Sequence, residues 1–408
     1  MRRQSLPMFA TIALLLLQPA GARPPAPEAL RYVGSNACRA CHPAIYDRWK
    51  VTRMANVVRD PKEHPDAFAP DLSKPNPLLT FRREEVAFVY GSKWKQRYFV
   101  KTGDQYFVLP VQWDIVHQTW LKYHPEPGED WWTSDYPSDP MKRPTGPLCD
   151  GCHSVDYNIQ SRSVAEWNVG CEKCHGPGSE HVKNPAGYAH NIVNPARLDF
   201  VRANDTCIQC HSQFRPLSNP IDGLYYDWAV GYQAGARLSD YVAMEEHVPG
   251  TNTFFYWPDG SPHKNRMQGN DFVTSAMYTH GVTCFVCHDP HGSVNDALLV
   301  KPADALCLQC HGPRSPNGPR GSIEEHTHHK PGGPGSDCVT CHMPQIAKEI
   351  ASFSVHSHTF RFISPAITMK YGTPNPCTSC HHHQTDAWAL AQLRKWENES
   401  PWRFDGRN

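Results

Sequence analysis

The stretch from residue 169 to residue 182, VGCEKCHGPGSEHV, holds two cysteines three positions apart, a histidine directly after the second, and another histidine six residues later. The first part of this pattern recurs throughout the chain. All 16 cysteines fall into eight C-x-x-C pairs, and a histidine follows every pair. Only 24 of the 408 residues are histidine, so chance does not account for eight coincidences. The repeated unit C-x-x-C-H is typical of covalent attachment of c-type haem.

Haem attachment explains every position of the unit. Each thiol adds to one vinyl group of the porphyrin, and the adjacent histidine becomes the proximal ligand of the iron. Structural zinc would use the cysteine pairs two at a time and would leave the histidines unexplained. Disulfides within the pairs would close very small loops that stabilise little.

We therefore expect eight covalently bound haem c groups at sites numbered 1 to 8 in chain order. The predicted attachment residues are Cys38 and Cys41, Cys149 and Cys152, Cys171 and Cys174, Cys207 and Cys210, Cys284 and Cys287, Cys307 and Cys310, Cys338 and Cys341, and Cys377 and Cys380. The predicted proximal iron ligands are His42, His153, His175, His211, His288, His311, His342 and His381.

The first 22 residues, MRRQSLPMFATIALLLLQPAGA, have the features of a secretory signal peptide: a charged start, a short apolar run and an A-x-A-type cleavage site. The apolar run is short for a membrane span, and no later segment is long enough, so we expect no stable span after cleavage. An uncleaved anchor is the alternative. The sequence thus predicts a periplasmic or extracellular protein, which is the compartment where haem is attached.

Formal side-chain charge is zero, with 40 basic and 40 acidic residues. Haem propionates would make the loaded protein acidic by roughly 8 to 16 charges, so part of the Lys and Arg should pair with propionates. No basic tract or base-reading motif is present, and a nucleic-acid partner is not expected.

The motif spacing divides the chain after the signal peptide into four parts, which we expect to form one compact multihaem unit. Residues 23–145 hold site 1 and an insert, 146–215 hold sites 2 to 4, 216–270 hold no motif, and 271–408 hold sites 5 to 8. The motif-free part could be a cover or a binding surface, and we favour a cover. Apolar content is only 39%, so the macrocycles should supply most of the buried apolar surface.

We expect a mainly α-helical protein with extensive loops. Residues 43–58 have helical spacing and open with a proline suited to a first turn, and residues 385–398 suggest an amphipathic helix. Residues 97–113, RYFVKTGDQYFVLPVQW, predict a small β-hairpin insert near residues 85–112.

Sixteen histidines remain for the distal side of the irons. His181 and His291 follow their own motifs by so few residues that each can hardly reach around its own macrocycle, so we expect both to cap neighbouring haems. At site 1, Met54 could also be a ligand, although a packing role is favoured. The further distal candidates are His117, His263, His328, His329 and His358.

Four stretches together resemble the exported multihaem c-type cytochromes grouped with cytochrome c nitrite reductase and hydroxylamine oxidoreductase. They are YVGSNACRACHPAIYDRW (32–49), CEKCHGPGSEH (171–181), GVTCFVCHDPHG (281–292), and CVTCHMP, HSHTFRF and GTPNPCTSCH between 338 and 381. The resemblance implies a helical wrapping, stacked and perpendicular haem pairs, bis-histidine ligation at most sites, and electron transfer. Catalytic members keep one haem open, and the C-x-x-C-K variant used by many nitrite reductases is absent from this sequence.

Two hypotheses follow. The favoured one is a non-enzymatic electron carrier whose partners are redox proteins, either quinol oxidase-type donors or other cytochromes. The alternative is an oxidoreductase that acts on nitrite, hydroxylamine or tetrathionate at one open haem, with a nearby His, Arg or Lys assisting. Polymerisation into a haem wire is a third possibility that the sequence does not test.

Overall fold

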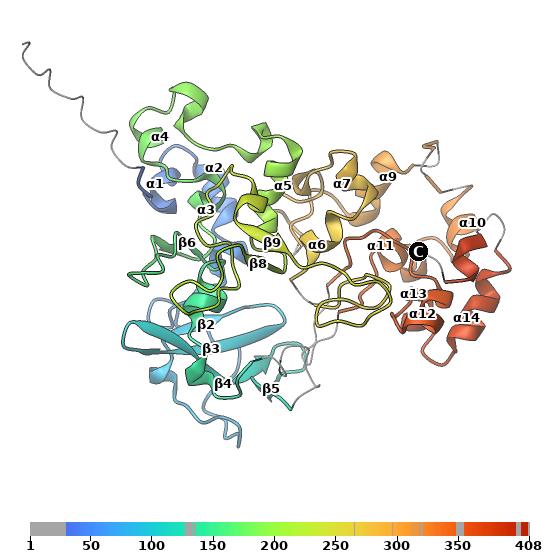
Figure 1. The fold of residues 1–408 in the computed structure, drawn as a ribbon, viewed down its shortest axis with the longest axis horizontal. Helices are drawn as coiled ribbons and strands as arrows, with labels where there is room; N and C mark the ends of the chain where they lie inside the picture. The colour runs from blue at the N-terminus through green and yellow to red at the C-terminus, as the bar shows by residue number, and fades with distance from the viewer. Residues whose placement is uncertain are drawn as a thin grey trace, which may run out of the picture.

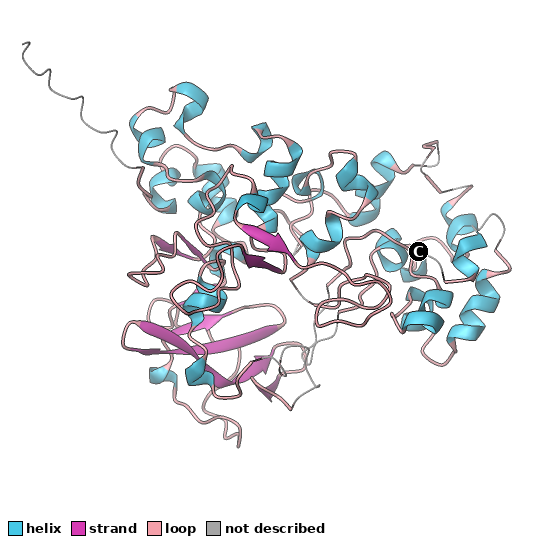
Figure 2. Cartoon of the chain, in the orientation of Figure 1, coloured by secondary structure: helices cyan, strands magenta, loops and turns pink. Residues whose placement is uncertain are grey.

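The computed structural model describes residues 30–126, 133, 136–264, 266–295, 297–312, 314–316, 318–319, 321–347, 355–396 and 401–406. The predicted signal peptide lies outside these ranges. Short helices joined by loops follow one another along the long axis, and a β-sheet lies to one side (Figures 1 and 2). None of the helices in the described ranges combines the length and hydropathy that a bilayer span requires.

The predicted hairpin is confirmed and is the centre of a larger sheet. Five antiparallel strands lie in chain order, and their bounds are β1 (Val58–Arg59), β2 (Phe88–Tyr90), β3 (Lys95–Thr102), β4 (Gln105–Asp114) and β5 (Thr119–Lys122). Side chains alternate between the two faces, as a strand requires. Phe88 and Tyr90 pack on one face against Cys149 and Trp167, whereas Val89 lies on the other. The sheet is thus attached to the site 2 motif by one face.

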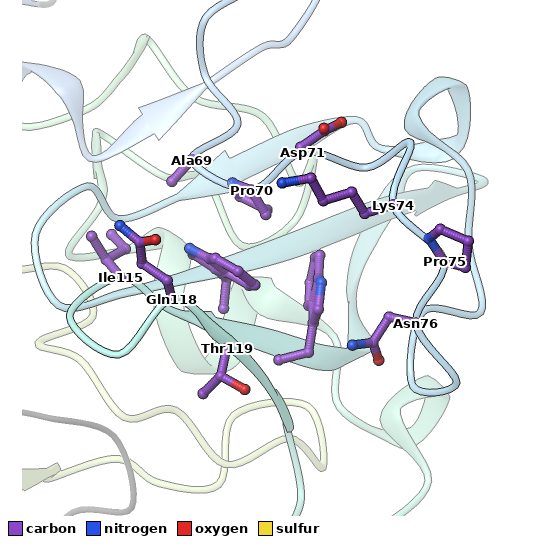
Figure 3. A pocket seen from close by; sticks show the side chains of 11 residues that line it. Ala69, Pro70, Asp71, Lys74, Pro75, Asn76, Ile115, Gln118 and Thr119 are labelled. Atoms are coloured by element: carbon purple, nitrogen blue, oxygen red, sulfur yellow. The ribbon is translucent and has the colours of Figure 1, made fainter.

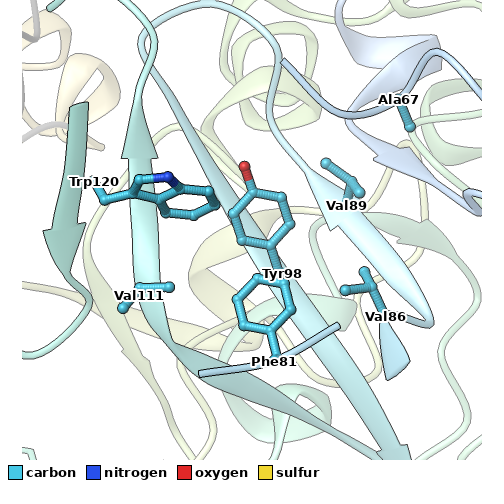
Figure 4. Close-up of a cluster of buried hydrophobic side chains, with 7 residues drawn as sticks. All are labelled: Ala67, Phe81, Val86, Val89, Tyr98, Val111 and Trp120. Atoms are coloured by element: carbon cyan, nitrogen blue, oxygen red, sulfur yellow. The ribbon is translucent and has the colours of Figure 1, made fainter. Parts of the chain in front are cut away.

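The second face of the sheet has its own apolar core, which contains no haem motif. Seven side chains converge there, with Tyr98 fully buried between Phe81 and Trp120 (Figure 4): Ala67, Phe81, Val86, Val89, Tyr98, Val111 and Trp120. Beside this core a cavity of about 510 Å³ is lined by Trp113, Trp120 and polar side chains of residues 71–76 and 118–119 (Figure 3). The insert therefore has a core that does not depend on a macrocycle.

The stretch 43–58 differs from the predicted single helix. The helix α2 (Pro43–Trp49) begins at the proline, as expected, but it ends at Trp49, and a short 3-10 turn η1 (Met54–Asn56) leads into β1. Val58 pairs with Tyr90, a partner far along the chain, and this pairing overrides the local helical pattern.

Sites 1 to 4 lie on short helices. Their bounds, with the small elements between them, are α1 (Ser35–Arg39), η2 (Arg83–Glu85), η3 (Pro140–Lys142), the π-type turn η4 (Gly146–Asp150), β6 (Ser154–Val155), β7 (Glu166–Trp167), α3 (Cys171–His175), α4 (Ser179–Lys183), η5 (Tyr188–Asn191), η6 (Pro195–Arg197) and α5 (Phe200–Ile208).

The motif-free part, residues 216–270, packs over sites 2 and 4. It contributes β9 (Val242–Met244), which pairs with β8 (Phe214–Pro216), and the turn η7 (Leu238–Asp240). Trp228 is buried, and its indole N–H donates to the Gly146 carbonyl at 2.9 Å. These contacts are what a cover requires, and a binding role for this part stays untested.

The C-terminal part is again made of short helices. Their bounds are α6 (Gln268–Phe272), α7 (Ala276–Thr279), α8 (Cys284–Cys287), α9 (Ala303–Cys310), α10 (Ile323–Thr327), η8 (Pro334–Ser336), α11 (Cys338–His342), α12 (Pro365–Tyr371), α13 (Pro376–Cys380), α14 (Asp386–Leu393) and η9 (Pro401–Phe404). The helix predicted over 385–398 is present as α14, and residues 397–398 lie outside the described ranges.

Candidate haem-binding sites

Each C-x-x-C-H unit forms about one helical turn. At site 1 the His42 N–H donates to the Cys38 carbonyl at 2.9 Å, and site 8 repeats this bond between His381 and Cys377 at 2.8 Å. Residues three apart on a helix lie on one side, so the two thiols of a unit point together. None of the sixteen cysteines forms a disulfide. The local geometry therefore suits attachment to one porphyrin edge.

Five predicted proximal histidines face a second imidazole. The ring centres are 6.1–6.4 Å apart, and the ring planes are 6–34° from parallel; the pairs are His42 with His181, His175 with His291, His288 with His358, His342 with His326, and His381 with His329. A bond from imidazole to a first-row metal such as zinc is about 2.0–2.1 Å, and the ring centre lies about 1.1 Å further, so two rings on one metal are about 6.3 Å apart. The spacing at sites 1, 3, 5, 7 and 8 thus fits bis-histidine ligation of iron.

The backbone anchors several of these rings through Nδ1. Nδ1 of His175 lies 2.8 Å from the Val193 carbonyl, and Nδ1 of His181 lies 2.7 Å from the His190 carbonyl. A ring whose Nδ1–H donates to a carbonyl presents Nε2 to a metal. Burial lowers the pKa of His342 and of His358 to about 4, which keeps both imidazoles in the neutral state that binds metal.

The structure brings four of the seven predicted distal residues to an imidazole of another motif. His181 faces site 1 and His291 faces site 3, so each lies across from a neighbour and not from its own haem, as the reach argument expects. His358 and His329 face sites 5 and 8. Their role as iron ligands remains a prediction.

The other three candidates lie elsewhere. His117 is near Asp114 at 3.1 Å on the sheet, and Nε2 of His263 lies 2.9 Å from the Thr253 carbonyl. His328 stacks on Trp396 with ring centres 4.4 Å apart.

His326, two residues before His328, is the residue that faces site 7, and it was absent from the candidates. The signal that could have found it is the capping box of Ser322 and Glu325, which fixes the helix α10 and places His326 on it. His328 follows the end of that helix in a left-handed conformation, which turns it away.

Cysteines from different motifs touch at four places. The thiols are within hydrogen-bonding reach in the pairs Cys38 and Cys171, Cys152 and Cys210, Cys207 and Cys284, and Cys307 and Cys338. Each pair joins cysteines at the same position of their two units. Sites 1 and 3, 2 and 4, 4 and 5, and 6 and 7 are therefore neighbours with matching attachment edges.

Three further cysteines lie near a neighbouring unit without touching it, and they connect these pairs. Cys174 of site 3 lies near Cys207 of site 4, Cys287 of site 5 near the site 6 cysteines, and Cys341 of site 7 near the site 8 cysteines. The order of neighbours is thus 1, 3, 4, 5, 6, 7 and 8, with site 2 as a branch from site 4.

Site 2 differs from the five sites at which the motif histidine faces a second imidazole. Within the described part of the chain no second imidazole lies at the ligating distance from His153 of site 2 or from His211 of site 4. The Tyr90 ring is 5.3 Å from the His153 ring, too close for a macrocycle to lie between them. Tyr90 therefore packs on the proximal side, where its hydroxyl donates to Asp150.

Three positively charged side chains, Arg266, Arg97 and Lys173, lie near His153. Burial, followed by the positive charges of Arg266, Arg97 and Lys173, lowers the pKa of this histidine to about 4. Arg266 is held by the Asp227 carbonyl at 3.1 Å and by Gln213 at 3.2 Å. Such an arrangement stabilises an anion, which can be a propionate or a bound oxyanion.

The family description "Doubled CXXCH motif" matches residues 277–315, which hold sites 5 and 6. This chain is a multihaem c-type cytochrome. Over 165 residues it is 28% identical to the multiheme cytochrome MtrA of Shewanella baltica, covering 40% of this chain and 47% of the relative. Over 407 aligned positions it is 22% identical to the dissimilatory sulfite reductase MccA of Wolinella succinogenes, covering 77% of this chain and 51% of the relative. The cytochrome thus spans about half the length of these curated relatives.

Solved structures share the fold. The outer cell wall cytochrome OcwA superposes on the cytochrome with a TM-score of 0.72 at 23% identity, covering 90% of this chain and 87% of that one. The undecaheme cytochrome from the S-layer of Carboxydothermus ferrireducens gives a TM-score of 0.50 at 18% identity, covering 90% and 62%. These likenesses concern the fold alone.

Proposed function

We propose that this protein is an octahaem cytochrome c that carries electrons outside the cytoplasm. The observation that carries the proposal is the continuous series of neighbouring cysteines, four pairs in contact and three pairs further apart, which joins all eight attachment units into one row with a single branch. Each of these sulfurs would be bonded directly to a porphyrin substituent. Their closeness would leave little protein between successive redox centres.

Haem iron, when bound, supplies a one-electron couple, and the facing imidazoles at sites 1, 3, 5, 7 and 8 would hold it from both sides. The chain's own residues suit this task. The two rings at each of these sites already lie at the spacing that ligation would require, so little rearrangement would accompany a change of charge. A carrier benefits from such rigidity because electron transfer is faster when few atoms have to move.

Export and redox partners belong to the same proposal. The N-terminal 22 residues have the pattern of a signal peptide, and the names of two related structures place those proteins at a cell wall and an S-layer. We expect donors and acceptors that are themselves redox proteins, either quinol oxidase-type donors or other cytochromes.

Haem stoichiometry and electron relay test the proposal. Mass spectrometry should show eight haems per mature chain, and a film of the ferric protein between a reduced donor and an electrode should pass current. A chain with fewer than eight haems would contradict the count. A fully loaded protein that conducts no better than an apoprotein film would contradict the relay.

A second candidate function rests on site 2. His153 lacks an opposite imidazole among the described residues and lies among Arg266, Arg97 and Lys173, so an open iron there could bind a small oxyanion of nitrogen or sulfur. Nitrite, hydroxylamine and tetrathionate are the substrates to assay, and sulfite joins them because one relative is a sulfite reductase.

Carbon monoxide added to the reduced protein tests this second candidate. A carbon monoxide adduct together with turnover that Arg266→Gln weakens would support it. The matched control is Arg202→Gln, which removes an exposed cation paired with Asp199 at 2.7 Å. Eight low-spin haems that do not bind carbon monoxide would refute the second candidate and leave electron transfer as the function. The cations around His153 would then pair with haem propionates.

A further inference from the structure

Three pairs of neighbouring sites share one contact that the electron-transfer proposal does not use. The first cysteine of one unit donates its backbone N–H to a side chain of the other unit: Cys171 to Ser35 Oγ at 2.9 Å, Cys284 to Asn204 Oδ1 at 2.9 Å, and Cys338 to Asp304 Oδ1 at 3.0 Å. These bonds join sites 1 and 3, 4 and 5, and 6 and 7. In each case the acceptor stands three residues before the first cysteine of its own unit.

The contact is a helix cap supplied by another helix. The helices α3, α8 and α11 each begin at the donating cysteine, and none of them is capped by the side chain of its own N-cap residue. The first N–H groups of a helix have no partner within that helix, so an outside acceptor satisfies one of them. The usual local cap is thus replaced by a bond between two motifs.

The same side chains also touch the sulfur that attaches the haem. Cys284 Sγ lies 3.2 Å from Asn204 Oδ1, and Ser35 and Asp304 are in contact with the thiols of Cys171 and Cys338. Ser35 and Asn204 are buried. Ser35 is itself fixed, because its hydroxyl donates to Glu166 at 2.8 Å. The cap is therefore located beside the sulfur that would attach one of the two macrocycles.

The fourth pair lacks this device. Sites 2 and 4 touch through their second cysteines, and the residue three positions before Cys149 is Gly146, which has no side chain to offer. The shared cap is thus confined to pairs along the main row and is absent at the branch.

We propose that Ser35, Asn204 and Asp304 are positioning residues that set the spacing between haems in the pairs 1 and 3, 4 and 5, and 6 and 7. The inference rests on the proposed electron-transfer function, because only a relay needs a fixed distance between redox centres. Removing one cap should shift the ratio of close to separated pairs about 2- to 30-fold, which corresponds to about 0.5–2 kcal/mol.

Asp304 offers the sharpest test. The variant Asp304→Ala removes the acceptor, whereas Asp304→Asn keeps an amide oxygen at the same place. The control Thr385→Ala removes an ordinary local cap, the bond from the Trp388 N–H at 3.1 Å, and leaves the three pairs untouched. All variants are compared as holoproteins with a measured haem content.

The readout is spin coupling between ferric haems in the EPR spectrum, which depends steeply on the distance between irons. We expect Asp304→Ala to bind eight haems and to show weaker spin coupling in one haem pair, with the ratio of close to separated pairs reduced about 2- to 30-fold. The variant Asp304→Asn should restore the coupling. The control Thr385→Ala should match the wild type. Unchanged coupling in Asp304→Ala would overturn the proposal. If Asp304→Ala does not mature, Ser35→Ala provides the same comparison at sites 1 and 3.

This test is separate from that of the proposed function. Failure of the wild-type protein to relay electrons would refute the relay, whereas the positioning role is judged by the difference between variant and wild type. A normal relay with unchanged coupling in both Asp304→Ala and Ser35→Ala would refute the positioning role alone.

Discussion

A single buried carboxylate connects site 3 to both sides of site 1. Glu172, the second residue of the C-E-K-C-H unit, has a side chain that is 2% exposed. Its carboxylate accepts the N–H groups of Val33 at 2.9 Å, Gly34 at 2.8 Å and Gly178 at 2.7 Å. Val33 and Gly34 lead into α1, which attaches haem 1, and Gly178 precedes α4, which carries His181. We predict that Glu172→Ala loosens both axial sides of site 1.

The magnitude follows from these three bonds. A hydrogen bond to a charged group contributes about 1.5–3 kcal/mol, and three bonds set an upper bound of about 4.5–9 kcal/mol. Bonds that share one acceptor are not additive, so we expect a loss of about 3–6 kcal/mol of local stability. The control Glu180→Ala removes an exposed ion pair with Lys183 at 3.0 Å, which should contribute at most about 1 kcal/mol.

The assay follows site 1 directly. In Glu172→Ala, detachment of His181 should give one high-spin ferric haem in the EPR spectrum at a urea concentration where the wild type and Glu180→Ala remain low-spin. Glu172→Gln should fall between, because it keeps one acceptor oxygen and loses the charge. A Glu172→Ala protein with the urea midpoint and the low-spin spectrum of the wild type would refute the reasoning.

Three further predictions concern other sites. The variant His291→Ala should create one high-spin, carbon-monoxide-binding haem at site 3, and the double variant with His358→Ala should create two; a count of one in the double variant would mean that both imidazoles serve one iron. Burial raises the pKa of Asp150 to about 6, so the free energy of unfolding should fall by up to about 3 kcal/mol as pH rises from about 4 to about 6 and stay level above. Urea titrations should show this slope in the wild type and not in Asp150→Asn. The nearly parallel ring planes at sites 1, 3, 5 and 7 should give rhombic low-spin EPR signals, and spectra dominated by signals of perpendicular ligands would contradict the geometry.

The C-x-x-C-H units, the hairpin and the placement of His181 and His291 opposite the histidines of other units were predictable because each depends on short stretches of chain. The cysteine spacing is local, and a reach of three to six residues bounds where a histidine can go. The strand at Val58 was not predictable in this way, because its partner Tyr90 lies 32 residues further on and the local pattern favoured a helix. The choice between His326 and His328 depended on where one helical turn ends, which is the least certain feature of a sequence-based assignment.

The caps at Ser35, Asn204 and Asp304 escaped the sequence analysis for a different reason. Three residue types occupy equivalent places, and their role appears only once the partner motif is known. The paired cysteines stand 133, 77 and 31 residues apart, from 38 to 171, from 207 to 284 and from 307 to 338, yet the bond is the same. The pair of units is therefore the element that the fold repeats, and the connecting chain is free to vary. This freedom explains how a five-stranded sheet with its own core fits between sites 1 and 2 without disturbing the geometry of sites 1 and 3.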